Sequence, residues 1–269
     1  MHKVVEKKQL ADTITLLKIE APLVVREAKS GQFVIVHLDE FAERIPLTIY
    51  DADRSRGIIT LIIQQVGRST GDLCALKPGD PIEDLLGPLG TPSEIERFGT
   101  VVIIGGGVGA AELYTAAKAL KEKGNKVITI IGARNKGLII LEDEFKAVAD
   151  ELLITTDDGS YGMKGLVTDA LKKIIADQAV HRIICCGPIP MMKAVTETAR
   201  PHNIPTIVSL NAILLDATGM CGTCRCTIEG KVRFSCVDGP EFDGYKVDFD
   251  ELMARNNRFL EEERRALEA

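Results

Sequence analysis

Residues 100–135 constrain the fold more than any other segment, because they read as strand, glycine turn, helix and strand in direct succession. Their sequence is TVVIIGGGVGAAELYTAAKALKEKGNKVITIIGARN. Both strand runs are continuously apolar, as expected where helices cover both faces of a parallel sheet. The alternation continues through residues 143–159, 166–188 and 191–211. We therefore expect a Rossmann-like parallel α/β domain of the doubly wound kind over residues 98–210.

The chain before this domain has a different pattern. Short runs rich in Ile, Val, Leu and Thr occupy residues 13–22, 31–38, 45–53, 57–66 and 80–90. Gly, Pro and Asp interrupt these runs at roughly ten-residue spacing, which indicates a small antiparallel β-structure. The pattern predicts an antiparallel β-barrel over residues 1–97, with one short helix over 69–80.

The last segment, residues 211–269, combines a cysteine- and glycine-rich loop region with a terminal helix. Residues 211–246 show little periodicity, which is typical of a small loop domain held by a metal. From Asp248 the sequence DFDELMARNNRFLEEERRALEA indicates a helix, with Asp248 or Asp250 as its N-cap. The side chains expected on one apolar face are Phe249, Leu252, Met253, Phe259 and Leu260.

Composition excludes several classes of partner. The net charge is −6, aromatic residues make up 4% and there is no Trp, which argues against nucleic acid and anionic membranes as partners. The N-terminus does not resemble a signal peptide, and no apolar run approaches the ~20 residues that span a bilayer. We expect a cytoplasmic protein, in which clustered cysteines indicate metal or redox sites before disulfides.

The glycine turn of residues 105–109 is suited to a phosphate. Glycines let a phosphate approach the backbone, and the following helix offers free N–H groups and the positive end of its dipole. Ala110 stands where the third glycine of G-x-G-x-x-G would be. The candidate phosphate-binding residues are Gly105, Gly106, Gly107, Val108 and Gly109. A glycine-rich turn without a ligand is the alternative.

Three further segments follow predicted strands of the same sheet. Because ligands of open α/β sheets lie at the carboxyl ends of strands, these segments share one crevice with the glycine turn. The candidate nucleotide-binding residues are Gly132, Ala133, Arg134, Asp157, Asp158, Cys186, Gly187, Pro188 and Met191. For Cys186, the alternative is a small buried apolar residue.

The barrel sequence contains a second candidate anion site. VGRSTGDL offers backbone N–H groups, hydroxyls and a guanidinium at the start of a short helix, which suits a pyrophosphate. The candidates there are Gly67, Arg68, Ser69 and Thr70, with Arg44, Pro46, Leu47 and Thr48 on a nearby strand. The pattern suggests two nucleotides bound end to end, although each segment alone is also compatible with an ordinary turn.

These residues together resemble the ferredoxin–NADP reductase superfamily over about residues 1–210. GRST resembles the phosphate turn of the family, and CGPIPMM resembles its C-G-P-x-x-M segment. The resemblance implies an FAD-binding barrel before an NAD(P)-binding domain, with Thr48 beside flavin N5 and Cys186 near the nicotinamide. RIPLT departs from the flavin motif, since Ile45 stands at the arginine position and Arg44 lies one residue early. The resemblance then implies that Arg68 shares the pyrophosphate. The acidic run EDEF after Arg134 favours NAD over NADP.

The cysteine-rich tail resembles two groups within this superfamily, both with FAD and one 2Fe–2S cluster. One comprises electron-transfer subunits of dihydroorotate dehydrogenase, and the other comprises small subunits of the electron-bifurcating NADH-dependent reduced ferredoxin:NADP+ oxidoreductase. Cys221 and Cys224 match the C-x2-C of plant-type clusters. The resemblance to the second group assigns Asp216, Cys221, Cys224 and Cys236 as ligands and leaves Cys226 as a neighbour. The alternatives are four cysteine ligands, a zinc ion in place of the cluster, and thiols that are merely buried.

The resemblance implies a converter between the two-electron chemistry of NAD(H) and single-electron transfer. Its partner would be a larger flavin and iron–sulfur subunit that binds ferredoxin and NADP, in a heteromeric complex. The rival within the enzyme class is the electron-transfer subunit of NAD-dependent dihydroorotate dehydrogenase. The rival from another class is a zinc-stabilised nucleotide-sensing module without redox activity.

Overall fold

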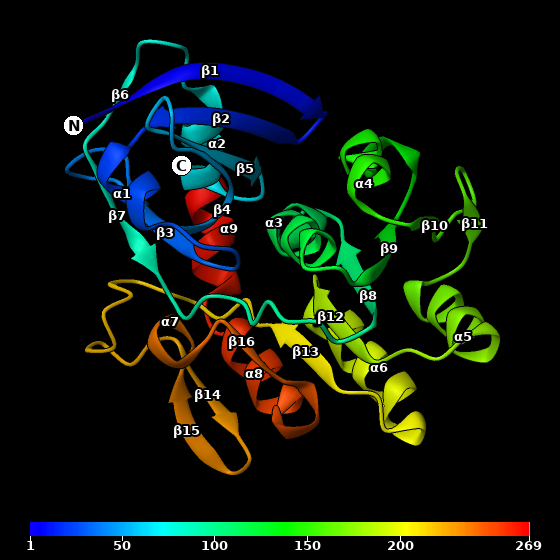
Figure 1. The fold of residues 1–269 in the computed structure, drawn as a ribbon. Helices are drawn as coiled ribbons and strands as arrows, with labels where there is room; N and C mark the ends of the chain where they lie inside the picture. The colour runs from blue at the N-terminus through cyan, green and yellow to red at the C-terminus, as the bar shows by residue number, and fades with distance from the viewer. Residues whose placement is uncertain (269) are drawn as a thin grey trace.

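The N-terminal part of the chain forms a seven-stranded antiparallel sheet curled into a barrel (Figure 1). The computed structural model describes residues 1–268. The sheet order is β6-β1-β2-β5-β4-β3-β7. Its elements are β1 (His2–Ala11), β2 (Ile14–Glu20), α1 (Pro22–Glu27), β3 (Phe33–His37), β4 (Arg44–Asp53), β5 (Ile58–Gln64), α2 (Arg68–Ala75), β6 (Pro81–Ile82) and β7 (Asp84–Leu89). The predicted barrel is confirmed, and the short helix predicted over 69–80 is present as α2 but ends at Ala75.

The sequence pattern did not reveal strand β1. Its sequence HKVVEKKQLA contains Glu6 and three lysines, and Val4 is its only buried residue. A strand that pairs on both sides but exposes most of its side chains has little apolar alternation to detect.

The second layer is a parallel sheet with helices on both faces. Its order is β11-β10-β9-β8-β12-β13-β16, and only the edge strand β16 runs antiparallel. Its elements are β8 (Thr100–Gly106), α3 (Gly109–Glu122), β9 (Lys126–Ala133), η1 (Lys136–Leu138), α4 (Glu142–Val148), β10 (Glu151–Thr156), β11 (Met163–Lys164), α5 (Val167–Asp177), β12 (Arg182–Cys186), α6 (Ile189–Ala199), η2 (Arg200–His202) and β13 (Thr206–Ser209). The chain order reverses between β8 and β12, so the ligand crevice of a doubly wound sheet lies there.

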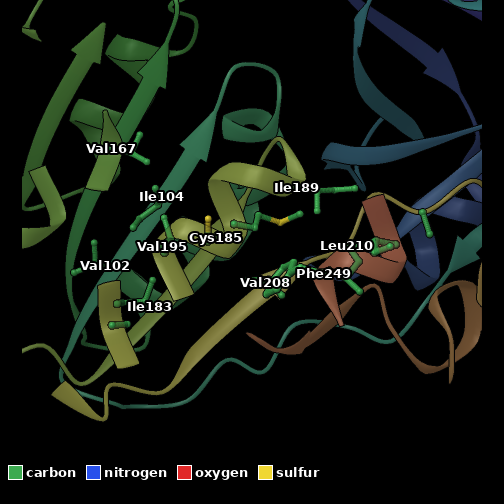
Figure 2. Close-up of a cluster of buried hydrophobic side chains, with 14 of the residues drawn as sticks. Val102, Ile104, Val167, Ile183, Cys185, Ile189, Val195, Val208, Leu210 and Phe249 are labelled. Atoms are coloured by element: carbon green, nitrogen blue, oxygen red, sulfur yellow. The ribbon is translucent and has the colours of Figure 1, made fainter. Parts of the chain in front are cut away.

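The C-terminal segment packs on this sheet. It contains β14 (Arg225–Ile228), β15 (Lys231–Phe234), α7 (Ser235–Asp238), β16 (Glu241–Asp243), η3 (Gly244–Lys246), α8 (Phe249–Asn256) and α9 (Leu260–Glu268). Figure 2 shows Phe249 of α8 beside Val208 and Leu210, in the cluster that also holds Ile104 and Ile183 of the sheet. Residues 211–256 therefore share a core with the α/β domain, and β16 completes its sheet.

The expected terminal helix is two helices. The Asp248 carboxylate caps α8 by accepting a hydrogen bond from Glu251 N at 2.9 Å. Leu252 is fully buried and Met253 packs against the same cluster, as predicted. The apolar face does not extend further, because the helix ends at Asn256, and Phe259 and Leu260 are 47% and 43% exposed. Helix α9 instead reaches toward the barrel (Figure 1). Within residues 1–268, no helix combines the length and apolarity needed to cross a bilayer.

Candidate functional site

A cavity of about 750 Å³ opens at the reversal point of the parallel sheet. It is lined by the glycine turn after β8, the ends of β9 and β10, and the start of α6. The predicted residues that line it are Gly106, Gly107, Val108, Gly109, Gly132, Ala133, Arg134, Asp157, Cys186, Gly187, Pro188 and Met191. Its size and its mixture of apolar walls with backbone donors suit a nucleotide.

The glycines of the turn serve two different purposes. A Cβ on Gly106 would lie 2.5 Å from Met191 Sδ, and one on Gly109 would lie 2.6 Å from the Cys186 carbonyl oxygen. These two glycines therefore allow the turn to pack against the segment after β12. Gly107 has φ +57°, and a Cβ there would meet no atom within 4 Å, so its open side faces the space left for a ligand.

Two predicted nucleotide residues lie away from the cavity wall. Gly105 is buried against Ala110, whose Cα would lie 2.4 Å from an added Cβ, so it shapes the turn. The Asp158 carboxylate accepts a hydrogen bond from Ser160 N at 2.9 Å and stabilises its own exposed loop.

A second cavity of about 340 Å³ lies between the barrel, the start of α3 and the C-terminal segment. Pro46, Leu47 and Thr48 of β4 line it, together with Phe33 and Tyr50. Largely apolar walls with a few hydroxyl groups suit a flat ring system. The opposite wall includes Ser235, whose hydroxyl is buried and has no hydrogen-bond partner among the described residues. An orphaned buried hydroxyl is costly, which fits a wall built to contact a bound group.

The predicted phosphate turn of the barrel lies between this cavity and a third one of about 500 Å³. Thr70 lines the second cavity, Arg68 and Ser69 line the third, and Ile45 lines both. Thr70 Oγ1 accepts a hydrogen bond from Gly67 N at 3.0 Å, which fixes the start of α2.

Arg44 is exposed at the start of β4, opposite His37 of β3, and is absent from the walls of all three cavities. The irregular position of Arg44 in the flavin motif is therefore visible in the geometry. Ile45, which stands at the arginine position of the motif, is the residue that faces the cavities.

The nucleotide cavity and the barrel cavity share a wall formed by Gln64, Val108, Glu112 and Asn211. Glu112 lies in the first turn of α3, and Cys186 Sγ donates a hydrogen bond to its Oε2 at 3.1 Å. The Thr48 side chain lines the barrel cavity together with this carboxylate. Burial raises the pKa of Glu112 above its usual range, while the nearby Cys186 and Thr48 side chains oppose that rise. The two residues predicted to flank the reacting rings thus both lie near one carboxyl group.

The sequence analysis missed Glu112, Ser235 and Asn211 as site residues. Glu112 follows the glycine turn by three residues, and an acidic group at that place was the available signal. Nothing in the sequence indicated Ser235 or Asn211, because both reach the cavity through the packing of the C-terminal segment on the barrel.

The structure brings two of the four predicted ligands of the cysteine loop into direct contact. Cys224 Sγ and Cys236 Sγ lie 3.2 Å apart, and both residues are 2% exposed. The Asp216 carboxylate accepts hydrogen bonds from Thr218 N at 3.1 Å and Cys221 N at 3.2 Å, and Cys221 is exposed. Among residues 1–268, no three Cys, His, Asp or Glu side chains converge closely enough to hold a metal ion. The four ligands therefore remain a prediction, with two thiols already in contact and the other two linked through the loop backbone.

Cys226 lies apart from this pair in the β14–β15 hairpin. It is buried, and its thiol points to the Arg233 carbonyl oxygen at 3.8 Å on the opposite strand. The geometry is compatible with a neighbour of the cluster that is not a ligand. The donor set of three thiols and a carboxylate, on a loop with Gly219 and Gly222 at positive φ, fits an iron–sulfur group.

The comparisons with known proteins agree with this arrangement. Residues 211–248 match the iron–sulfur cluster binding domain of dihydroorotate dehydrogenase B, and residues 103–197 match the oxidoreductase NAD-binding domain. An electron transfer subunit homolog of dihydroorotate dehydrogenase B (NAD(+)) from Thermotoga maritima is 48% identical over 98% of this chain and 93% of that protein. The chain belongs to this family of electron-transfer subunits. The subunit accordingly contains an NAD-binding domain and an iron–sulfur domain, and the family match disfavours the zinc-stabilised alternative.

Two further similar proteins correspond to the two groups that the cysteine-rich tail resembles. The dihydroorotate dehydrogenase B electron transfer subunit of Geobacillus thermodenitrificans is 34% identical over 91% of this chain and 96% of that protein. A chain in the structure of NADH-dependent reduced ferredoxin-NADP oxidoreductase, reported for flavin-based electron bifurcation, is 47% identical. It superposes with a TM-score of 0.95 over 100% of this subunit and 97% of that chain. The subunit is thus an oxidoreductase component related to subunits of heteromeric complexes, with FAD, NAD and an iron–sulfur cluster as the cofactors of its fold and family.

Proposed function

We propose that the subunit exchanges hydride with NAD(H) and single electrons with a larger flavin and iron–sulfur subunit, in electron-bifurcating ferredoxin-dependent transhydrogenation. The observation that carries this proposal is the shared wall at Glu112, where the nucleotide cavity meets the barrel cavity. The barrel cavity also reaches Ser235, the residue before the predicted ligand Cys236. The three cofactor sites therefore lie in the order in which electrons would travel.

The protein contributes positioning. The glycine turn and residues 186–188 would hold the nicotinamide nucleotide in the large cavity, and Pro46, Leu47 and Thr48 would hold the flavin ring in the smaller one. Bound FAD exchanges two electrons with NAD(H) as a hydride and single electrons with the cluster. The buried Cys186 thiol stays neutral, since burial and the nearby Glu112 raise its pKa. It thus acts as a hydrogen-bond donor that orients the Glu112 carboxylate.

Glu112→Gln tests the shared wall. Because burial raises the pKa of Glu112, its carboxyl group stays protonated to a higher pH than an ordinary glutamate and ionises only above that, and glutamine mimics the protonated form. Ionised Glu112 stabilises the positive charge that develops on the nicotinamide ring as NADH gives up hydride. Flavin reduction by NADH should be equal in both proteins at low pH and about tenfold slower in the variant at high pH.

The measurement is anaerobic stopped-flow absorbance over a pH series. Glu122→Gln, at the exposed end of the same helix, is the matched control and should follow the wild type. Parallel profiles for wild type and Glu112→Gln would remove Glu112 from the reaction.

Asp216→Cys tests the oxygen ligand, on which the choice between the two relatives rests. The variant should keep its cluster and show a changed electron paramagnetic resonance spectrum, because a thiolate is softer and more covalent toward iron than a carboxylate. Thr218→Cys adds a thiol to the same exposed loop and should leave the spectrum unchanged. A wild-type spectrum in Asp216→Cys would refute the ligand assignment.

The identity of the partner subunit is the most specific part of the proposal. The 47% identity and TM-score of 0.95 to a chain of the bifurcating oxidoreductase structure favour a ferredoxin- and NADP-binding partner. We also propose a cytoplasmic location, because NADH and reduced thiols are found there. Affinity purification of the tagged subunit from its own cells tests the assignment. Recovery of a flavin and iron–sulfur protein with NADPH- and ferredoxin-dependent activity supports it.

The second candidate is the electron-transfer subunit of dihydroorotate dehydrogenase. The Geobacillus thermodenitrificans relative and the matched iron–sulfur domain model favour it. Co-purification of a dihydroorotate-oxidising flavoprotein would establish it and overturn the bifurcating assignment.

A further inference from the structure

Two arginines bind the two carbonyl groups between the predicted ligands Cys221 and Cys224. Arg225 Nη1 donates to the Gly222 carbonyl oxygen at 3.2 Å, and Arg255 Nη2 donates to the Thr223 carbonyl oxygen at 3.1 Å. Arg225 follows Cys224 in the chain, whereas Arg255 comes from helix α8, 32 residues after Thr223. Two separate elements thus hold the same short turn.

We propose that Arg255, assisted by Arg225, is a positioning residue that raises the reduction potential of the iron–sulfur centre. This inference rests on the proposed function, because it takes Cys221 and Cys224 as cluster ligands.

The two arginines fix the direction of the peptide groups between Cys221 and Cys224. In a trans peptide the carbonyl of one residue and the N–H of the next point in opposite directions. With the Gly222 and Thr223 carbonyls turned to the guanidinium groups, the N–H groups of Thr223 and Cys224 point the other way. Peptide N–H groups directed at cluster or cysteine sulfur stabilise added negative charge, which raises the potential.

Arg255 also brings a positive charge that is largely buried. Arg255 is 8% exposed, so water screens its guanidinium weakly. Among the described residues, its ion-pair partner is Glu251, whose Oε1 lies 3.9 Å from Arg255 Nη1. The other Glu251 oxygen accepts a hydrogen bond from Thr227 N at 3.0 Å. A buried cation with one distant carboxylate is costly unless further negative charge lies nearby.

The positive charge of Arg255 lies beside the loop that carries Cys221. A cavity of about 160 Å³ is lined by Cys221, Thr223, Arg225, Arg255 and Arg258. The guanidinium groups of Arg225 and Arg255 contact the cluster loop, and Arg258 lies at the exposed side of the same cavity. Reduction adds one electron to the cluster, and a positive charge held next to it favours the reduced form. Loss of the Arg255 charge should favour the oxidised form instead.

The experiment compares Arg255→Met, Arg255→Lys, Arg225→Met and the control Arg258→Gln in the full-length, cluster-loaded subunit. Arg258 lines the same cavity but is exposed. Absorbance and electron paramagnetic resonance first establish that each protein holds the cluster. A wild-type protein without one would refute the proposed function rather than this inference.

A redox titration followed by electron paramagnetic resonance then gives the midpoint. At the wild-type midpoint potential, the ratio of reduced to oxidised cluster in Arg255→Met should fall about tenfold, equivalent to 59 mV for one electron. Arg255→Lys keeps the charge and should shift less, Arg225→Met should shift in the same direction, and Arg258→Gln should stay near wild type. A wild-type midpoint in cluster-loaded Arg255→Met would overturn the inference. If neither Arg255 variant holds a cluster, an unchanged midpoint in Arg225→Met would overturn it.

Discussion

Cys236→Ala is expected to abolish the electron paramagnetic resonance signal of the reduced cluster while NADH still bleaches the flavin. Cys236 Sγ lies 3.2 Å from Cys224 Sγ, and the predicted ligand set has no substitute thiolate in that position. The barrel and nucleotide cavities draw most of their walls from residues 14–194, so flavin reduction should change by about twofold at most. Electron transfer to a one-electron partner should fall by about a hundredfold or more.

Cys226→Ala is the matched control for this variant. Cys226 is equally buried, only ten residues away, but its thiol points to the Arg233 carbonyl oxygen. It should keep the cluster and its signal, at a stability cost of about 1 kcal/mol for the small void. Cluster loss in Cys226→Ala together with its retention in Cys236→Ala would replace Cys236 by Cys226 in the ligand set.

Gly107→Val is expected to weaken NADH binding about a hundredfold, or ~2.7 kcal/mol. A valine at φ +57° carries backbone strain of about 1–2 kcal/mol, and its side chain would enter the space that faces the nucleotide cavity. The same side chain would block a phosphate from the N–H groups at the start of α3. Isothermal titration with NADH measures the loss, and the flavin and cluster content should stay at wild-type levels.

Gly124→Val separates strain from occlusion. Gly124 has φ +88° and, like Gly107, no atom within 4 Å of an added Cβ, but it lies on the exposed turn after α3. The control should lose similar stability and bind NADH normally. Equal NADH affinity in wild type and Gly107→Val would mean that the nucleotide does not use this turn.

The fold was predictable where periodicity and turn residues agree. The apolar run of β8, the glycines and the helix after them favour one local arrangement, and a cavity lies where they predict the nucleotide crevice. The elements that escaped prediction have weak local signals. Strand β1 exposes most of its side chains, and β16 has three residues that pair with β13 only because the C-terminal segment folds back.

The candidate site was predictable for backbone-defined features and unpredictable for contacts made across domains. Cys186 and Thr48 could be located from motifs, but the position of Glu112 beside both depends on how the barrel sits on α3. Arg255 could not be connected to the cysteine loop from the sequence, because 32 residues and a hairpin separate it from Thr223.

The most direct test of the account is anaerobic titration of the purified subunit with NADH, followed by absorbance and electron paramagnetic resonance on the same samples. NADH should bleach the flavin bands and produce the signal of a reduced 2Fe–2S cluster, and this signal should be lost in Cys236→Ala. A protein without flavin or cluster bands, or a flavin bleached by NADH beside a cluster that stays oxidised, would contradict the account.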